Sequence, residues 1–465
     1  MVSRPRMLSL ILLFVIGSLA IGSAADPQQA RRGAPVPAAP TMQAQPPAVP
    51  VIGRLPAILT LRDQSEMYNA WLTVRLERVL PELMRAEGID MWLVVCRENN
   101  EDPVFLSLVP FSTMYAGRTT ILVFTDKGPE GVERLSVSRM GNGPLYQSVW
   151  DPDRIDQWAR LAEIITERSP RKIGINESDT FTFADGLTAS LKRKLLASLP
   201  QDFQARIQPA ERLAIRWLER RTPDEMEVYP HIVSIAHGII AEAFSRTVIT
   251  PGVTTTDDVV WYLPERSRQL GLENWFQPSV DIQRPRNTPY GQSPVIHRGD
   301  LLHCDFGITY LRLCTDTQQM AYVMRDTEAE APKGLQAAFA KGNRLQDILL
   351  AEMKTGLTGN AILAAALKKA KAESIQASIY SHPIGFHGHA AGTIIGLWDK
   401  QGGVPGLGDF PLYDDTAHSV ELSARVVAPE FGNIDIRIQL EQDILFRRTG
   451  PTWMDQRQTA LILIR

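Results

Sequence analysis

Four acidic residues stand in segments that otherwise have the apolar character of buried β-strands. Asp305 closes the run LLHCD, Asp316 follows it by eleven residues, Glu421 lies between Val and Leu, and Glu441 follows Leu440. A carboxylate among apolar neighbours is costly to bury unless a partner neutralises its charge. A fold that buries these strands is therefore expected to bring the four acids together around positive charge.

Imidazole groups lie close by in the sequence. The Gly- and His-rich stretch from Ser381 to His389 contains His382, His387 and His389. Four carboxylates and one imidazole match two divalent cations in charge and donor type, with Mn or Zn favoured and Co or Fe also suited to these donors. Two such cations can share a bridging water, lower its pKa and stabilise an oxyanion, so the pattern predicts hydrolysis.

Each of these residues also has a purely structural interpretation. Asp305 could be a turn residue before Gly307, and Glu421 could be a surface acid on an edge strand. The three histidines could form a hydrogen-bonded core cluster or a metal-scavenging tract. The order and spacing favour a shared site instead: two Asp eleven residues apart, then a Gly/His loop, then two apolar-flanked Glu twenty residues apart.

Composition and charge restrict the class of protein. The 465 residues allow about three domains, or two larger ones. A hydrophobic content of 44% with 22% charged residues excludes wholesale disorder and a coiled-coil rod. The net charge of -3 argues against a partner such as nucleic acid or an anionic membrane. Three Cys cannot build a disulfide scaffold, and we expect Cys304 and Cys314 to be buried free thiols.

The first 55 residues have the pattern of a targeting segment followed by a flexible linker. Arg4 and Arg6 precede an apolar run from Leu8 to Ile21, and small residues follow it. This layout is typical of a secretory signal peptide over residues 1–25, and the apolar run is too short to span a membrane. Residues 26–55 are rich in Pro, Ala and Gln and are expected to be a disordered linker. We therefore expect an exported protein, periplasmic or extracellular, without a membrane anchor after cleavage.

The remaining chain divides into two expected domains. Residues 56–208 alternate helical and strand patterns, with a helix over 67–88 and strands over 91–96, 119–124 and 172–175, which predicts an α/β domain. Residues 209–465 open with the capped helix start at Thr222, Pro223 and Glu225. Two further helices are expected within 335–377, and strands over 300–305, 313–323, 418–427 and 434–447. This mixture predicts an α+β domain with helices on a curved antiparallel sheet.

With these motifs in view, the chain resembles the creatinase/aminopeptidase P/prolidase family of peptidases over nearly all of residues 56–465. The segment from Glu211 to Glu225 looks like the usual entry into the family's catalytic domain. The resemblance implies a C-terminal pita-bread catalytic domain, preceded by a smaller creatinase-like α/β domain. It also implies two metals bound by Asp, Asp, His, Glu and Glu.

On that pattern the metal ligands are Asp305, Asp316, His387, Glu421 and Glu441. The resemblance implies that a metal-bridging hydroxide attacks the scissile carbonyl and that Glu421 takes the proton from the water. His389 is the candidate for stabilising the oxyanion or the substrate carboxylate. His382 and His389 remain alternatives to His387 as the imidazole ligand.

Other positions depart from the family pattern. Family members usually carry a second, substrate-facing His seven residues after the ligand, and counting from His387 this position is Ile394. The imidazole expected upstream of the first Asp is also missing from residues 284–288. The family usually has one Arg a few residues after the second Asp and another two residues before the last Glu. Here Gln318 and Gln319 stand near the first position, and Gln439 stands at the second. These departures put selectivity for proline in question more than hydrolysis.

Three functions compete at this stage. The first is an exported dinuclear metallopeptidase of the Xaa-Pro aminopeptidase or prolidase type, which cleaves short peptides near the N-terminus. The second is a metal-binding pita-bread protein that binds a peptide or a partner without turnover. The third, a metal-free C–N hydrolase like creatinase, would gain nothing from four buried acids. A homodimer is compatible with the resemblance, since members of this family often dimerise.

Overall fold

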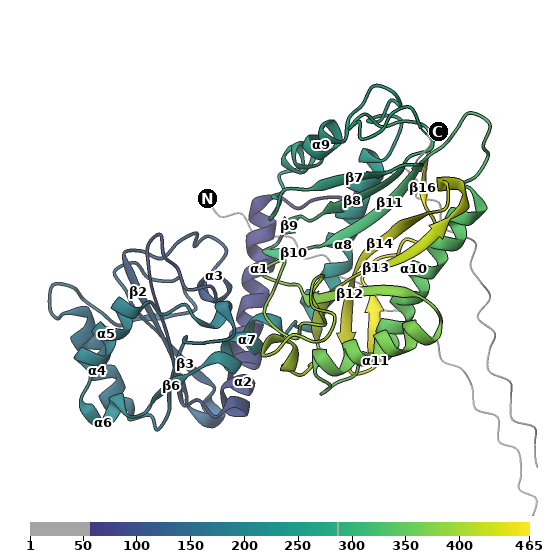
Figure 1. Ribbon diagram of the computed structural model, residues 1–465. Helices are drawn as coiled ribbons and strands as arrows, with labels where there is room; N and C mark the ends of the chain where they lie inside the picture. The colour runs from purple at the N-terminus through teal and green to yellow at the C-terminus, as the bar shows by residue number, and fades with distance from the viewer. Residues whose placement is uncertain (1–55, 286–287) are drawn as a thin grey trace, which may run out of the picture. The chain divides into compact units, whose positions relative to one another are not determined.

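The structure, a computed structural model, describes residues 56–285 and 288–465 (Figure 1). The expected signal peptide and linker, residues 1–25 and 26–55, lie outside the described residues. Two β-sheets organise the chain, one built from strands between residues 91 and 209 and the other from strands between 279 and 464.

The first sheet is mixed and has the strand order β4-β3-β2-β1-β5-β6. Its strands are β1 Met91–Arg97, β2 Thr119–Asp126, β3 Val132–Val137, β4 Gln147–Ser148, β5 Ile173–Ile175 and β6 Ile207–Pro209. Alternate residues of β1 enter two different hydrophobic cores, Trp92 and Val94 on one face and Leu93 and Val95 on the other. Because both faces are covered, the strand is a continuous apolar run rather than an alternating one.

Helices cover both faces of this sheet. The long segment predicted over 67–88 is present as α1 Leu61–Val74, a π-helical turn Arg75–Val79 and α2 Leu80–Glu87. It ends at Gly88, whose φ of 65° lies in the left-handed region that favours glycine. The remaining helices are α3 Phe105–Leu108, α4 Gln157–Arg168, α5 Ala189–Ser198 and α6 Gln201–Gln204.

The second sheet has eight strands, and its main path runs β12-β13-β14-β11-β8-β7 with antiparallel pairing throughout. The strands are β7 Ser279–Gln283, β8 Leu301–Phe306, β11 Thr317–Val323, β12 Gln376–Pro383, β13 Thr416–Ala428, β14 Ile434–Arg447, β15 Gly450–Trp453 and β16 Ile462–Ile464. A separate two-stranded hairpin pairs β9 Thr309–Tyr310 with β10 Leu313–Cys314. Sequence reasoning expected one strand over 313–323, but Thr315 and Asp316 are not in a strand and separate β10 from β11.

Four helices accompany the second sheet: α8 Pro223–Ala243, α9 Thr256–Gln269, α10 Lys333–Glu352 and α11 Gly359–Ala372. The preceding helix, α7 Glu211–Glu219, packs against α2 instead. Thr222 and Glu225 form the predicted capping box at the start of α8. The helices α10 and α11 confirm the pair expected within 335–377; α10 packs against β13 and β14, and α11 against β12 (Figure 1). No helix among the described residues combines the length and apolarity that crossing a bilayer requires.

Candidate metal centre

Strand register brings three of the four predicted acids into one row. Asp305 on β8 lies opposite Gln318 on β11, Gln318 lies opposite Glu441 on β14, and Glu441 lies opposite Glu421 on β13. Side chains at directly opposed positions point to the same face of a sheet. The pairing of four strands therefore gathers acids that are up to 136 positions apart in the sequence.

Asp316 lies in the two-residue connection between β10 and β11, and its side chain reaches the same row. Its carboxylate lies with those of Asp305 and Glu441 in a group whose ligand atoms are all within 4.8 Å of one another. A second group with the same limit contains His382, Glu421 and Glu441. The structure thus brings all four predicted acids into one cluster, with Glu441 common to both groups.

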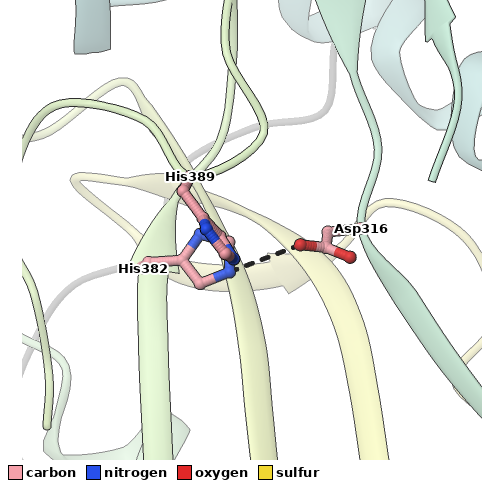
Figure 2. Close-up of side chains that lie close together, drawn as sticks. All are labelled: Asp316, His382 and His389. Atoms are coloured by element: carbon pink, nitrogen blue, oxygen red, sulfur yellow. Dashed lines mark ion pairs between the residues drawn. The ribbon is translucent and has the colours of Figure 1, made fainter. Parts of the chain in front are cut away.

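The imidazole at this cluster belongs to His382. It lies on β12 opposite Ser419, and its ring is fully buried. The ring Nε2 lies 3.5 Å from Asp316 (Figure 2) and 3.6 Å from Glu441, while Nδ1 lies 3.0 Å from the carbonyl oxygen of Pro383. A ring that donates Nδ1–H to a backbone carbonyl has its lone pair on Nε2, and histidines that bind metals commonly have this arrangement.

His387, which sequence reasoning assigned as the ligand, lies elsewhere. Its ring stacks on Phe183 at 4.5 Å between centroids, and its Nε2 lies 3.3 Å from the carbonyl oxygen of Pro103. Among the described residues it takes part in none of the candidate cation groups. The reason is local: β12 continues through Pro383, which an edge strand tolerates, whereas His387 follows in a loop beyond the sheet.

His389 lies beside His382. The two rings are 4.7 Å apart and nearly perpendicular, and Asp316, His382 and His389 form a third candidate group (Figure 2). Counted from His382, His389 stands at the seven-residue spacing that the family resemblance implies for the substrate-facing histidine. The expectation that this second histidine is missing rested on counting from His387 instead.

Aromatic side chains surround the exposed imidazole of His389. The Trp275 ring lies 5.2 Å from it and the Tyr380 ring 6.0 Å from it, both measured between centroids. The indole N–H of Trp275 donates to the carbonyl oxygen of Thr315, which fixes the ring against the connection that carries Asp316. His389 is therefore held at the open side of the cluster, next to an apolar wall.

Burial and mutual repulsion govern the charges of the cluster. Burial raises the pKa of the Asp305 carboxyl, and the nearby Glu441, Asp316 and Glu421 carboxylates raise it further. Burial and Glu441 likewise raise the pKa of Asp316 and of Glu421, and in both cases His382 opposes the shift. Burial lowers the pKa of His382, but the carboxylates of Asp316 and Glu441 outweigh it and bring that pKa well above its ordinary value.

The donor atoms fit divalent cations. Among the described residues, Asp305 Oδ1 and His382 Nε2 are buried without a hydrogen-bond partner. Buried polar atoms are rarely left unpaired, so an unpaired ligand atom in each of two groups that share Glu441 indicates missing positive partners. Carboxylate oxygens with a single imidazole suit Mn or Zn and offer no thiolate.

Three further residues of the cluster were not among the predicted site residues. Asp443, fully buried, accepts a hydrogen bond of 3.2 Å from the Asp316 backbone N–H, and burial raises its pKa. Its signal was present, since it stands two positions after Glu441 on the same strand face. Ser419 Oγ donates to Glu441 Oε1 at 2.7 Å, and the Gln318 amide donates to Glu421 at 3.0 Å. Neither had a local sequence signal, because both contacts depend on strand register.

The cysteines are free, as expected. Cys96, Cys304 and Cys314 are all buried, and within the described part of the chain none forms a disulfide. Burial raises the pKa of Cys96 and of Cys314 to about 12. Because the thiolate is the reactive form, these residues behave as inert apolar side chains.

Comparisons with known proteins agree with this geometry. Residues 231–442 match the sequence model of metallopeptidase family M24, and no curated protein matches the chain. The chain is similar to the X-Pro aminopeptidase from Thermotoga maritima MSB8, with 17% identity, a TM-score of 0.59 and coverage of 82% of this chain and 99% of that one. It is also similar to the Xaa-Pro dipeptidase from Bacillus anthracis, with 18% identity, a TM-score of 0.56 and coverage of 87% of this chain and 100% of that one.

The N-terminal domain of the FACT complex subunit SPT16 from chickpea (Cicer arietinum) has a similar structure, with 12% identity, a TM-score of 0.51 and coverage of 87% of this chain and 99% of that one. At such low identities the likeness concerns the fold. The mixed α+β fold with a curled antiparallel sheet in the C-terminal region, predicted from the sequence as a pita-bread domain, is confirmed.

Proposed function

We propose that the chain, whose residues 231–442 match the sequence model of metallopeptidase family M24, is a dinuclear metal-dependent peptidase that hydrolyses the N-terminal peptide bond of short peptides. One observation carries the proposal. Four carboxylates and one imidazole, contributed by different strands and turns, meet in a buried cluster in which like charges otherwise repel one another. Such an arrangement is costly to fold without cations to neutralise it.

The residues that would hold the cations follow from the two groups. Asp305, Asp316 and Glu441 form one, and His382, Glu421 and Glu441 form the other. When bound there, divalent cations supply Lewis acidity and lower the pKa of a coordinated water. Mn or Zn fits these donors best, with Co or Fe as further candidates.

The chain's own groups would then handle the substrate and the proton. Glu421 lies at the edge of the cluster, half-buried, so its carboxylate can take a proton from the attacking water and pass it to the leaving amine. His389, exposed beside His382, would donate to the carbonyl oxygen or to the substrate carboxylate. Trp275 and Tyr380 provide an apolar surface for the residues flanking the scissile bond.

The substrate class is proposed from the structural neighbours. Two of them are named for action on X-Pro or Xaa-Pro peptides, so Xaa-Pro peptides are the first substrates to test. The test is release of the N-terminal amino acid from an Xaa-Pro peptide and from a matched Xaa-Ala peptide by the Mn-loaded protein. Asp316→Ala should abolish release, and release that persists in this variant would refute the scheme.

The fold alone does not settle catalysis, because functions reside in sites that different folds can host. A similar structure is named for a subunit of the FACT complex. A protein that binds two cations but hydrolyses no member of a broad peptide library would be a binding protein with this fold. That outcome would replace the proposed peptidase.

Export and self-association also belong to the proposal. The basic and apolar pattern of residues 1–25 supports cleavage near residue 25 and release outside the cytoplasm. Mass spectrometry of the protein recovered from the medium or the periplasm would show the new N-terminus. Light scattering after size-exclusion chromatography would test the homodimer.

A further inference from the structure

A line of three polar side chains leads from the surface to the cluster. The Gln318 amide nitrogen lies 3.0 Å from Glu421 Oε1, and its amide oxygen lies 2.8 Å from His303 Nε2. The other ring nitrogen of His303, Nδ1, lies 3.5 Å from Asp281 Oδ2. His303 and Gln318 are each 3% exposed, whereas the Asp281 side chain is 67% exposed.

Strand pairing creates this line. Asp281 on β7 lies opposite His303 on β8, and His303 stands two residues before Asp305. Gln318 on β11 lies opposite Asp305 and opposite Glu441. All of these side chains therefore emerge on one face of the sheet, and the line reaches Glu421 across three strands.

The chemistry of the groups sets the direction of each hydrogen bond. The Gln318 oxygen can only accept, so His303 Nε2 must donate to it. The Gln318 nitrogen can only donate, so Glu421 Oε1 must accept. One oxygen of Glu421 is thereby occupied, and the other is left for a cation.

We propose that Gln318 and His303 are positioning residues that fix the Glu421 carboxylate for cation binding and proton transfer, with Asp281 next to the outer ring nitrogen of His303. This inference rests on the proposed function. Groups behind a ligand commonly orient it, and their loss typically weakens metal binding by about 10- to 100-fold. The hydrogen bond from the Gln318 amide also holds the plane of the Glu421 carboxylate, because tilting that plane away from the amide would break the hydrogen bond.

The line is also rigid. Gln318 and His303 are buried between paired strands, so neither side chain can swing away without leaving polar atoms unsatisfied. Gln442 donates to the Gln318 carbonyl at 3.2 Å, which ties the backbone of β11 to β14 at the same place. The contribution of each member should fall with distance from Glu421, and the exposed Asp281 should contribute least.

The experiment is calorimetric titration of the metal-free protein with Mn²⁺. Gln318→Met keeps the length of the side chain but removes both hydrogen bonds, and one of two Mn²⁺ should bind about 10- to 100-fold more weakly while the other is unchanged. The matched control is Gln157→Met: Gln157 is a buried glutamine of the N-terminal sheet that donates to the Thr119 and Val137 carbonyls. Its variant should bind both Mn²⁺ as the wild type does.

A second pair of variants keeps the inference testable if Gln318→Met folds poorly. His303→Leu should weaken the same Mn²⁺, and His303→Gln, which restores a donor toward Gln318, should recover most of the affinity. With an Xaa-Pro peptide, kcat should fall in Gln318→Met with little change in KM, because Glu421 acts on the proton and not on substrate binding.

The failures are distinguishable. A wild-type protein that binds no Mn²⁺ would overturn the proposed function and this inference with it. Two wild-type Mn²⁺ sites with equal affinities in Gln318→Met and His303→Leu would overturn the inference alone. Equal losses in Gln318→Met and Gln157→Met would show a general effect on folding and would also overturn it.

Discussion

Removing the cations should make the stability of this protein fall as the pH rises. Without cations, the pKa of Asp316 is raised to about 7, that of Glu421 to about 8 and that of Asp305 to about 10, by burial and then by repulsion among the carboxylates. The folded state therefore holds protons that the unfolded chain releases near pH 4. Stability is fully present below that pH and is lost as the pH rises through the folded pKa values.

The magnitude follows from the number of excess protons. Each one lowers the free energy of unfolding by about 1.4 kcal/mol per pH unit. One to three such protons give a slope of about -1.4 to -4 kcal/mol per pH unit between about pH 5 and pH 7. The raised pKa of His382 adds a contribution of the same sign above about pH 6.5.

The assay is urea unfolding at several pH values, with the same protein either chelated or saturated with Mn²⁺. Burial raises the pKa of Glu219 to about 8, so this residue also makes stability fall as the pH rises. Its contribution to the free energy of unfolding is the same in both forms and cancels in the difference between them. Bound cations remove the repulsion, so the saturated protein should not lose stability with rising pH at this site. Parallel pH profiles for the two forms would refute the reasoning.

Three further predictions, which use four variants, test other residues of the structure. His382→Ala should lose one of two bound cations by mass-spectrometric metal analysis, whereas His387→Ala should keep both; equal losses would contradict the assignment of the ligand. Glu219→Gln should raise the free energy of unfolding by up to about 4 kcal/mol at pH 8 and by almost nothing at pH 4. In the described chain neither oxygen of this buried carboxylate has a hydrogen-bond partner, and burial raises its pKa to about 8. Arg75→Met should cost about 1.5–3 kcal/mol in urea unfolding, because it removes the 3.1 Å ion pair to the buried Glu225, which keeps Arg221 at 3.3 Å. A cost below about 0.5 kcal/mol would show that the pair is dispensable.

The acids of the site could be predicted from the sequence because their surroundings are local. A carboxylate inside an apolar run is conspicuous, and Asp305, Glu421 and Glu441 each interrupt one. Helix ends could also be predicted from local residues: Thr222 caps α8, and Gly88 ends the long segment that begins with α1. These signals lie within a few residues of the feature that they predict.

The imidazole ligand and its supporting groups could not be predicted in the same way. Choosing between His382 and His387 required knowing that β12 extends through Pro383 and pairs with β13. The spacing of seven residues from His382 to His389 was visible, but it became decisive only with the strand boundary fixed. Gln318 likewise acquires its contact with Glu421 from the pairing of distant strands, which no local pattern specifies.

The ratio of bound metal to protein, in the wild type and in Asp316→Ala, tests the central claim most directly. Asp316 lies in two of the candidate groups, one with Asp305 and one with His382. We expect close to two Mn²⁺ or Zn²⁺ per chain in the wild type and a loss of both in the variant. A wild-type chain that binds neither ion, or a variant that keeps both, would contradict a paired cation site built from these side chains.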